Sequence, residues 1–454
     1  MSFQSQNPAT GESLEQFPSL SAEQLELALA TAADAVPIWS NTAIASRCKR
    51  VARLAEIIRV RRDELAQLIT LEMGKLYSEA QAEIEKCAVG CDYYAENGAA
   101  QLADEIIESD ASRSLITYQP LGTILAVMPW NFPFWQLIRA AIPALIAGNT
   151  VVMKHASNVP QCALAIDSIF REAGFADGVF INLMIESNRV EAVIRDPRIH
   201  GVTLTGSGPA GRSVAATAGS VLKRSLLELG GSDPFIVLDD ADIDLAVQHA
   251  MMGRFLNCGQ SCIAAKRFIV VEAIAEQFVT KFSKIVAGLQ VGDPTDPETT
   301  MAPMARADLR DELHQQVVQS VALGAKIIVG GHPLERPGFY YAATIIDNVT
   351  PEQPAWSEEL FGPVATVIRV RDEREAIDVA NSSDFGLGAA VFTSDSERGE
   401  RIARQLECGS AFVNGMVKSD PRLPFGGIKQ SGYGRELSYM GIREFVNAKT
   451  LWIK

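Results

Sequence analysis

Short runs of β-branched residues alternate with helical segments along most of this chain, and this alternation limits the folds open to it. The first set of runs is at residues 122–127, 150–153, 179–183 and 201–204, and a further apolar run follows at 225–229. The second set is at residues 234–238, 267–271, 326–329, 364–370, 389–392 and 411–414. Such alternation is typical of βαβ units, in which a helix connects two parallel strands. The sequence therefore predicts two α/β domains that meet near residue 230, ahead of a helix expected at 243–256.

The first hundred residues have helical periodicity instead. A Ser-x-x-Gln cap at Ser21 predicts a helix to residue 36, and apolar residues at helical spacing predict a long amphipathic helix at 45–73. A third helix is expected at 75–97. Because 454 residues exceed what one hydrophobic core usually organises, we expect two or three domains.

The composition and charge of the chain argue against a nucleic-acid-binding, membrane-spanning or exported protein. The net charge of -14 argues against binding to nucleic acid or to an anionic membrane. The most apolar stretch, 121–153, is interrupted by prolines and by Arg139, so no membrane span is expected. The first residues lack the basic and apolar pattern of a signal peptide. The seven cysteines match neither a disulfide framework nor a paired metal site, so we expect reduced thiols, no metal and a cytoplasmic location.

Four short motifs occur in a fixed order along the chain. They are Pro129-Trp130-Asn131-Phe132-Pro133, Glu228-Leu229-Gly230-Gly231, Gln260-Ser261-Cys262 and Glu359-Leu360-Phe361-Gly362-Pro363. Each alone has an ordinary explanation, since a single cysteine is more often a small buried hydrophobe than a nucleophile. Together they resemble the aldehyde dehydrogenase superfamily. The resemblance extends from residues 7–11 to residues 424–432 and so covers nearly the whole chain.

The resemblance implies an α/β fold with three parts. A Rossmann-like cofactor-binding domain is expected at 1–103 and 120–229, and an α/β catalytic domain at 230–432. A small β oligomerisation extension is expected at 104–119 and 433–454. Relatives use such an extension to assemble, so a homo-dimer or homo-tetramer is expected.

The resemblance also assigns the chemistry. Cys262 is the nucleophile, and its sulfur adds to an aldehyde to form a thiohemiacetal. Asn131 and the backbone N–H of Cys262 form an oxyanion hole for the developing negative charge. Hydride passes to a nicotinamide, and the thioester left on Cys262 is cleaved by water with Glu228 as general base. Without the motifs, Asn131 would be a turn asparagine and Glu228 a surface glutamate.

A glycine-rich turn is the expected dinucleotide site. Gly206, Ser207 and Gly211 follow an apolar run and precede a helix, whose N-terminal N–H groups can bind a pyrophosphate. The spacing differs from the usual GxGxxG fingerprint, and a simple glycine-rich turn is the alternative. By resemblance, three further residues contact the nicotinamide half of the cofactor: Trp130, Glu359 and Phe361.

Two residues bear on the choice between NAD and NADP. Lys154 is expected to reach the adenosine ribose or a phosphate on it, and Ser157 follows three residues later. Many NAD-preferring relatives have a glutamate at the position of Ser157, which accepts hydrogen bonds from the ribose hydroxyls and repels a 2'-phosphate. Serine removes that repulsion. We therefore predict that NADP is preferred and that NAD can also serve.

An arginine inside an apolar helix points to the substrate. Arg139 lies about two helical turns after Asn131, and a buried guanidinium needs an anionic partner. Succinate-semialdehyde dehydrogenases have an arginine at the matching place, so a small aldehyde carrying a carboxylate is expected, with Trp135 and Ser419 also contacting it. The predicted reaction is oxidation of succinate semialdehyde to succinate. The alternative is an arginine paired with a structural carboxylate.

Other interpretations stay open at this stage. The aldehyde can be glutarate semialdehyde or an aromatic aldehyde, and relatives that transfer the acyl group to coenzyme A are not excluded. A catalytically silent nucleotide-binding relative is a further alternative, although the joint presence of Asn131, Glu228 and Cys262 argues against it. Cys258 lies four residues before Cys262, and a reversible disulfide between them is a minor hypothesis beside that of a buried thiol.

Overall fold

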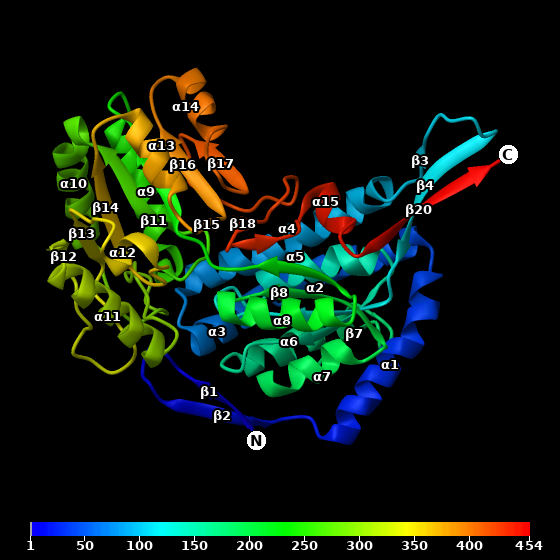
Figure 1. Ribbon diagram of the computed structural model, residues 1–454. Coiled ribbons are helices and arrows are strands. Elements are labelled where there is room, and N and C mark those ends of the chain that lie inside the picture. Colours follow the sequence, from blue (N-terminus) through cyan, green and yellow to red (C-terminus); the bar gives the residue numbers. More distant parts are fainter. Residues whose placement is uncertain (1) are drawn as a thin grey trace.

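The computed structural model describes residues 2–454, which fold around two large sheets with helices on their faces (Figure 1). The chain begins with an antiparallel hairpin of β1 (Ser2–Gln6) and β2 (Ser13–Pro18). Four helices follow: α1 (Ala22–Ser40), α2 (Ile44–Val60), α3 (Arg62–Met73) and α4 (Tyr77–Gln101). The predicted cap at Ser21 is confirmed, because Ser21 and Gln24 each accept the other's backbone N–H through their side chains.

The first large sheet has six strands in the order β19-β9-β8-β5-β6-β7. Its strands are β5 (Thr123–Val127), β6 (Thr150–Lys154), β7 (Phe180–Asn182), β8 (Ile199–Thr205), β9 (Arg224–Glu228) and β19 (Gly432–Tyr433). The connecting helices are α5 (Trp135–Ile146), α6 (Pro160–Glu172), η1 (Ser187–Arg189), α7 (Val190–Arg195) and α8 (Gly208–Ser220). Every neighbouring pair is parallel except β19 with β9, which confirms the predicted βαβ units. The chain moves outward from β5 to β7 and then returns to β8 on the other side of β5, so the strand order reverses there.

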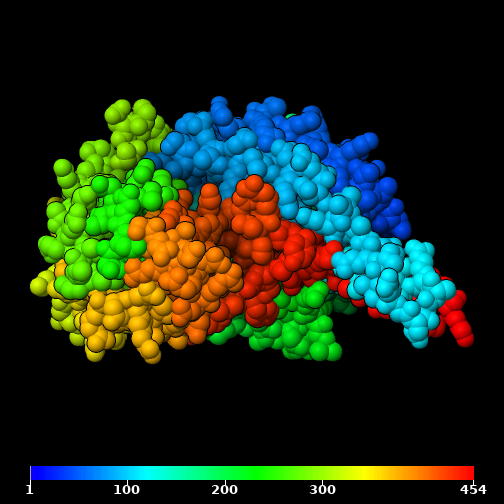
Figure 2. All heavy atoms as spheres, turned by 90° about the horizontal axis from the view of Figure 1, so that it is seen from above, coloured from blue at the N-terminus to red at the C-terminus, as the bar shows by residue number. Residues whose placement is uncertain are grey.

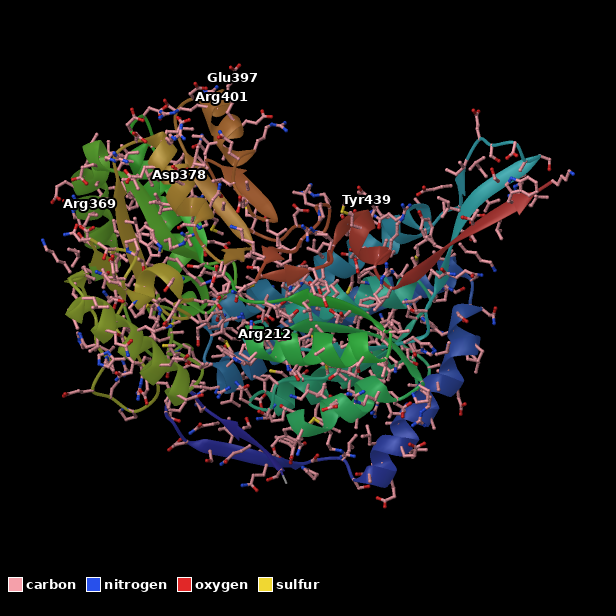
Figure 3. All side chains as sticks on the ribbon, viewed as in Figure 1. Arg212, Arg369, Asp378, Glu397, Arg401 and Tyr439 are labelled. Carbon is pink, nitrogen blue, oxygen red and sulfur yellow. The ribbon has the colours of Figure 1, made fainter. Side chains whose placement is uncertain are left out.

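The second large sheet has seven strands in the order β12-β13-β14-β11-β10-β16-β17. Its strands are β10 (Asp233–Val237), β11 (Ala265–Val271), β12 (Lys326–Val329), β13 (Thr344–Asp347), β14 (Val364–Val370), β16 (Gly388–Phe392) and β17 (Ser410–Val413). Its helices are α9 (Ile243–Phe255), η2 (Leu256–Gly259), α10 (Glu272–Ala287), α11 (Ala307–Ala322), α12 (Pro354–Ser357), α13 (Glu373–Asn381) and α14 (Ser396–Ala403). Here the pair of β12 with β13 is antiparallel. Charged side chains such as Arg369 and Glu397 lie on the outside of this part of the molecule (Figure 3).

A smaller sheet projects from the body of the molecule (Figure 1). It has the order β20-β4-β3 and consists of β3 (Glu105–Ile106), β4 (Arg113–Pro120) and β20 (Val446–Ile453). The short remaining elements are β15 (Phe385–Gly386), β18 (Ile428–Lys429) and α15 (Ser438–Ile442). Tyr433, which we expected in the extension, instead pairs with Leu227 in the six-stranded sheet. The backbone approaches so closely there that a side chain on Gly432 would collide with the Leu227 carbonyl oxygen. The other domain boundaries stay a prediction.

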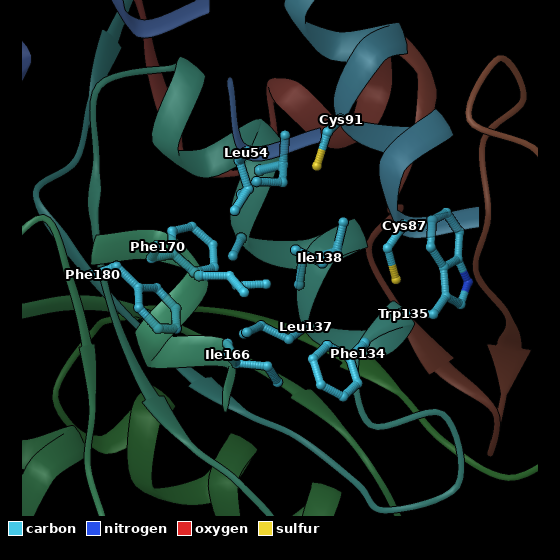
Figure 4. Close-up of a cluster of buried hydrophobic side chains, with 14 of the residues drawn as sticks. Leu54, Cys87, Cys91, Phe134, Trp135, Leu137, Ile138, Ile166, Phe170 and Phe180 are labelled. Carbon is cyan, nitrogen blue, oxygen red and sulfur yellow. The ribbon is translucent and has the colours of Figure 1, made fainter. Parts of the chain in front are cut away.

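The helix that follows the 129–133 motif is the centre of the first core. All twelve residues of α5 are buried, including the polar Gln136 and Arg139. Around them lie aromatic side chains of α6 and β7, where Phe170 stacks on Phe180 with ring centroids 4.0 Å apart (Figure 4). Burial of this kind fixes the helix on all sides. The loop before α5, which carries Asn131, is therefore held rigidly against the sheet.

Three local features differ from the sequence prediction. The long helix expected at 45–73 is broken at Arg61, whose backbone leaves helical geometry and ends α2. The polar hairpin β1–β2 and the strand β13 were not predicted, because neither shows a clear strand pattern in the sequence. Within residues 2–454, no helix has both the length and the apolar character needed to cross a membrane.

Candidate active site

A cavity of about 520 Å³ lies where loops from the two large sheets face each other. The six-stranded sheet contributes residues that follow β5, β8 and β9, and the other sheet contributes the segments before β11 and β14. Seven of the predicted site residues line it: Trp130, Asn131, Gly206, Ser207, Cys262, Glu359 and Phe361. The cavity thus lies at the carboxyl ends of parallel strands where their order reverses, the usual ligand site of such sheets.

The turn before Cys262 has an unusual backbone. Asn257 and Cys258 have φ angles of 56° and 54°, and Gly259 has a φ of 71°. Non-glycine residues in this left-handed region cost roughly 1–2 kcal/mol each. A side chain on Gly259 would also come within 2.4 Å of the Gly362 carbonyl oxygen. The turn therefore needs a glycine at position 259, and it needs other contacts to hold it.

Hydrogen bonds from three parts of the chain hold this turn. The carboxylate of Glu79 on α4 accepts the backbone N–H of Asn257 at 3.1 and 3.2 Å. The side-chain amide of Asn257 donates to the carbonyl oxygens of Asn131 and Gln260, at 2.9 and 3.1 Å. The Asn131 amide also donates to the Gln260 carbonyl, at 3.0 Å. Because an amide has two N–H groups, Asn131 keeps one that a substrate oxygen can accept.

Lys266, which sequence reasoning missed, also holds the nucleophile in place. Its ammonium donates to the carbonyl oxygens of Ser261 and Cys262 at 2.8 Å and lies 3.1 Å from a Glu359 carboxylate oxygen. The side chain is buried at the start of β11. Two adjacent basic residues, Lys266 and Arg267, directly before an apolar run were the signal that could have revealed it.

The thiol of Cys262 holds its proton firmly in this arrangement. Burial, together with the carboxylates of Glu228 and Glu359, raises its pKa to about 12, against the opposing charges of Arg139 and Lys266. A thiol with such a pKa is protonated at neutral pH. Attack on an aldehyde therefore requires transfer of that proton to a base.

Glu228 ends β9 and lies in a buried cluster with Arg139 and Glu436. Its side chain is 1% exposed, and neither carboxylate oxygen has a hydrogen-bond partner among residues 2–454. Burial and the charge of Glu436 raise the pKa of Glu228 to about 8, against the opposing charges of Arg139 and Arg435. Glu228 lies behind the cavity wall that its neighbours Leu229 and Gly230 form. A carboxyl group whose pKa is close to the working pH is suited to proton transfer.

The structure changes the interpretation of Arg139. Its guanidinium forms an ion pair with Glu436, lies 3.9 Å from Glu228 and packs over the ring of Phe425. It is buried and does not line the cavity, because the face of α5 that carries it packs against the segment around residues 425–436. The sequence alternative, a structural carboxylate partner, is thus the arrangement observed. The ion pair joins residues almost 300 positions apart, so the sequence could not reveal it.

The two other predicted substrate residues lie together, beside a lysine that we did not predict. The ammonium of Lys86 on α4 donates to the hydroxyl oxygen of Ser419 at 2.7 Å and lies 4.7 Å from the centre of a Trp135 ring. Trp135 is followed directly by Gln136, which lines the cavity of Cys262. Both Trp135 and Ser419 are buried.

Most of the residues predicted to contact the nicotinamide and the pyrophosphate of the cofactor line one cavity. Gly206 and Ser207 lead into α8, whose first turn has no side-chain cap and so leaves its N–H groups for a phosphate. Arg212 on α8 lines the same cavity (Figure 3). The rings of Trp130 and Phe361 meet edge to face, with centroids 5.8 Å apart. The Glu359 carboxylate is held by the Gly231 N–H at 3.0 Å.

Gly211 has a different role from the one predicted. It lines neither of the cavities described here, and a side chain at this position would come within 2.6 Å of Leu229. The close packing of α8 against the end of β9 therefore requires a glycine. Gly211 supports the turn by allowing α8 to pack against Leu229, and it is not placed to contact a phosphate.

Lys154 and Ser157 line a second cavity of about 680 Å³, which strand β1 helps to enclose. The ammonium of Lys154 lies at the carboxyl end of β6, 3.5 Å from the Ser187 hydroxyl, and burial lowers its pKa. Glu186 and Arg306 line the same cavity. Lysine and hydroxyl donors in one cavity, and an uncapped helix N-terminus in the other, fit the phosphates of a dinucleotide.

The fold and the cysteine-containing cavity agree with one class of protein. The chain belongs to the aldehyde dehydrogenase family, whose sequence model matches residues 1–451. Succinate semialdehyde dehydrogenase Sad of Escherichia coli strain K12, described as using NAD(P)+, is 48% identical over 446 residues that cover 98% of this chain and 96% of the relative. A probable NADP(+) succinate-semialdehyde dehydrogenase of Synechocystis sp. strain PCC 6803 is 50% identical and covers 98% of both chains.

Solved structures support the same assignment. Succinic semialdehyde dehydrogenase from Streptococcus pyogenes, crystallised in complex with NADP+ as the cofactor, superposes with a TM-score of 0.98. It is 40% identical, and the match covers 99% of both chains. The family and the α/β fold class predicted from the sequence are therefore confirmed.

Proposed function

We propose that this protein oxidises succinate semialdehyde to succinate, with NADP preferred as hydride acceptor and NAD also used. The observation that carries the proposal is that Cys262 lines one cavity together with Asn131, Glu359 and the uncapped N-terminus of α8. A nucleophile, an oxyanion donor and a dinucleotide site thus face the same space. The relatives named above add the substrate class and the preference for NADP.

In the first half of the reaction, the thiol of Cys262 gives its proton to water in the cavity, and the sulfur bonds to the aldehyde carbon. The carbonyl oxygen takes up the negative charge, and the second N–H of the Asn131 amide and the backbone N–H of Cys262 stabilise it. Such donors contribute about 3 kcal/mol each. Lys266 keeps the Ser261 and Cys262 carbonyl groups directed away from that oxygen, because it binds both. The bound nicotinamide supplies the acceptor for the hydride that leaves the thiohemiacetal carbon.

In the second half, water cleaves the thioester on Cys262. We assign the general base to Glu228, whose carboxylate takes a proton from the attacking water. The water oxygen bonds to the acyl carbon, the carbon–sulfur bond breaks, and the carboxylic acid product leaves. Arg139 and Glu436 position Glu228 and set its pKa through their charges.

Steady-state kinetics with succinate semialdehyde, glutarate semialdehyde, benzaldehyde and butanal, each with NADP and with NAD, test the proposal. We expect the highest kcat/KM for succinate semialdehyde with NADP. A higher value for glutarate semialdehyde or benzaldehyde would reassign the substrate. Formation of acyl-coenzyme A when coenzyme A is added would replace hydrolysis as the second step, and a folded protein without any aldehyde-dependent reduction would be a silent relative.

Ser157 offers a direct test of cofactor preference. Ser157→Glu places a carboxylate in the cavity that contains Lys154. Because a carboxylate repels a 2'-phosphate and accepts hydrogen bonds from ribose hydroxyls, kcat/KM for NADP should fall by roughly 10- to 100-fold. The value for NAD should stay the same or rise. Ser157→Ala is the matched control and should lose far less, and a wild-type enzyme that already prefers NAD would contradict the proposal.

We also propose that the small sheet mediates assembly into a homo-dimer or homo-tetramer in the cytoplasm. Apolar residues on its strands are exposed in the single chain, among them Ile106, Trp452 and Ile453. All seven cysteines are free thiols, including Cys258 and Cys262, which fits a reducing compartment. Sedimentation of the purified protein tests the assembly, and a monomer at micromolar concentration would contradict it.

A further inference from the structure

One helix, α4, holds both loops from which the oxyanion donors come. Glu79 and Glu83 lie four residues apart on this helix, so they project from the same face of it. Glu79 accepts the backbone N–H of Asn257, in the turn before Cys262. Glu83 binds the backbone directly after the loop that carries Asn131. Two glutamates one helical turn apart thus connect α4 to the two sides of the site.

Glu83 supplies the N-terminal cap that α5 lacks in its own sequence. Phe134, at the start of this helix, makes no side-chain cap. One carboxylate oxygen of Glu83 instead accepts the backbone N–H groups of Phe134 and Trp135, at 3.0 and 3.1 Å. The first N–H groups of a helix have no partner within it, so this carboxylate fixes where α5 begins. Asn131 precedes that point in the same loop.

Lys75, which directly precedes the start of α4, supplies the counter-charge. Its buried ammonium is hydrogen-bonded to the second carboxylate oxygen of Glu83 and lies 3.8 Å from the centre of the Phe132 ring. Burial raises the pKa of Glu79, and the Asn257 N–H and the charge of Lys75 oppose that rise. Lys75 therefore acts on both glutamates. Buried ion pairs usually contribute little net stability, so a role in fixing the loop accounts better for this one.

The packing of the molecule lets one helix hold both loops. α4 packs on α2 and α5 within the first core. Seen from above, the blue N-terminal helices adjoin green segments of the second half of the molecule as well as orange-red C-terminal segments (Figure 2). The turn at Asn257 and Cys258 has a left-handed backbone, so it relaxes unless outside contacts hold it. A rigid helix on which both loops are fastened provides such contacts.

We propose that Glu79 and Glu83 are positioning residues that set the distance between the two oxyanion donors, the Asn131 amide and the Cys262 backbone N–H. This inference rests on the proposed function, in which both donors stabilise one oxygen. Neither glutamate lines the cavity of Cys262, so each acts through the loop that it holds. A displacement of about 1 Å between catalytic groups costs roughly 100-fold in rate, so a small shift of either loop matters.

Glu79→Ala tests the arm that carries Cys262. The Asn257 N–H loses its acceptor, so the rate of the first hydride transfer should fall by roughly 10- to 100-fold. Stopped-flow absorbance of the reduced cofactor measures that rate. The dissociation constant of NADP should stay the same, because no residue of α4 lines either cavity.

Two further variants serve as controls for Glu79→Ala. Glu79→Gln keeps a side-chain oxygen that can accept the Asn257 N–H, so it should recover most of the rate. Glu85→Ala removes a half-exposed glutamate of the same helix, which pairs with Arg59 on the surface. Surface ion pairs contribute little, so the rate and the melting temperature should both be unchanged.

A double-mutant cycle shows which group Glu79 acts through. In the Asn131→Ala background, Glu79→Ala should cost much less than it does in the wild type, because the distance between two donors no longer matters once one donor is gone. Alkylation of Cys262 by iodoacetamide provides a second readout. This reaction forms no oxyanion, so its rate in Glu79→Ala should change far less than the rate of hydride transfer.

The arm that carries Asn131 is tested with the ion pair replaced as a whole, because loss of Glu83 alone leaves a buried charge on Lys75. Lys75→Met with Glu83→Gln retains an oxygen for the N–H groups of α5, whereas Lys75→Met with Glu83→Leu retains none. The two double variants have the same net charge. Hydride transfer should be roughly 10-fold or more slower in the leucine variant than in the glutamine variant.

The outcomes separate this inference from the proposed function. A rate of hydride transfer in Glu79→Ala equal to that of the wild type would overturn the inference and leave the proposed function intact. Additive losses in the cycle, or an equal fall in alkylation, would also overturn it, since they would show a displaced thiol or a general loss of structure. A wild type that forms no reduced cofactor from succinate semialdehyde would overturn the proposed function, and the inference with it.

Discussion

Cys262→Ala should lower kcat for aldehyde oxidation by about 10⁴-fold or more while the protein still folds and binds its cofactor. The residual chemistry cannot proceed through a thiohemiacetal, because alanine has no nucleophile. The hydrogen bonds that hold the turn go to backbone groups and to Asn257, so they survive the change. Aldehyde-dependent reduction of NADP, followed by absorbance, measures the loss, and circular dichroism and cofactor titration check the fold.

Cys408→Ala is the matched control for that variant. Cys408 is, like Cys262, a partly exposed free thiol, but it lines a different and much smaller pocket. It should retain nearly full activity. If Cys262→Ala oxidised the aldehyde as fast as the wild type, the sulfur of Cys262 could not be the nucleophile.

Glu228→Gln should stop the cycle after the hydride has left. The steady-state rate should fall by roughly 100-fold or more, because a neutral amide cannot take a proton from water. The first turnover should still form about one reduced cofactor per active site, so a rapid burst should precede a slow phase. Stopped-flow absorbance resolves the two phases, and slow kinetics without a burst would place Glu228 before the thioester.

The raised pKa of Glu228 also predicts how the steady-state rate depends on pH. A general base acts in its ionised form, so the steady-state rate should rise with pH as Glu228 ionises near pH 8. The charge of Glu436 contributes to that raised pKa, so Glu436→Gln should move the rise to lower pH. A rise that stays in place in Glu436→Gln would exclude the coupling between the two carboxylates.

The parts of the fold that follow from local pattern were predictable. β5, β6 and β8 are short runs rich in β-branched residues between helices, and this pattern indicated parallel strands. The break at Arg61 was not predicted, because both α2 and α3 have helical periodicity and the register continues across it. β13 is only four residues long and follows a turn-rich segment, so its Thr-Ile-Ile run was not recognised as a strand.

In the candidate site too, residues within sequence motifs were predictable, whereas contacts between distant segments were not. Cys262, Asn131 and Glu359 lie within recognisable motifs and meet at one cavity, although their roles in the reaction stay proposals. Arg139 pairs with Glu436, and Lys86 donates to Ser419; each partner is about 300 or more positions away in the sequence, and only the folded chain brings them together. A buried charge is visible in a sequence as a charged residue in an apolar segment, whereas its counter-charge is not.

Mass spectrometry of enzyme quenched during turnover tests the central claim most directly. Glu228→Gln supplied with succinate semialdehyde and NADP should accumulate the acyl group, and peptide mapping should locate a succinyl thioester on Cys262. An acyl group on another residue, or none on a protein that has formed reduced cofactor, would contradict a mechanism in which the sulfur of Cys262 carries the substrate.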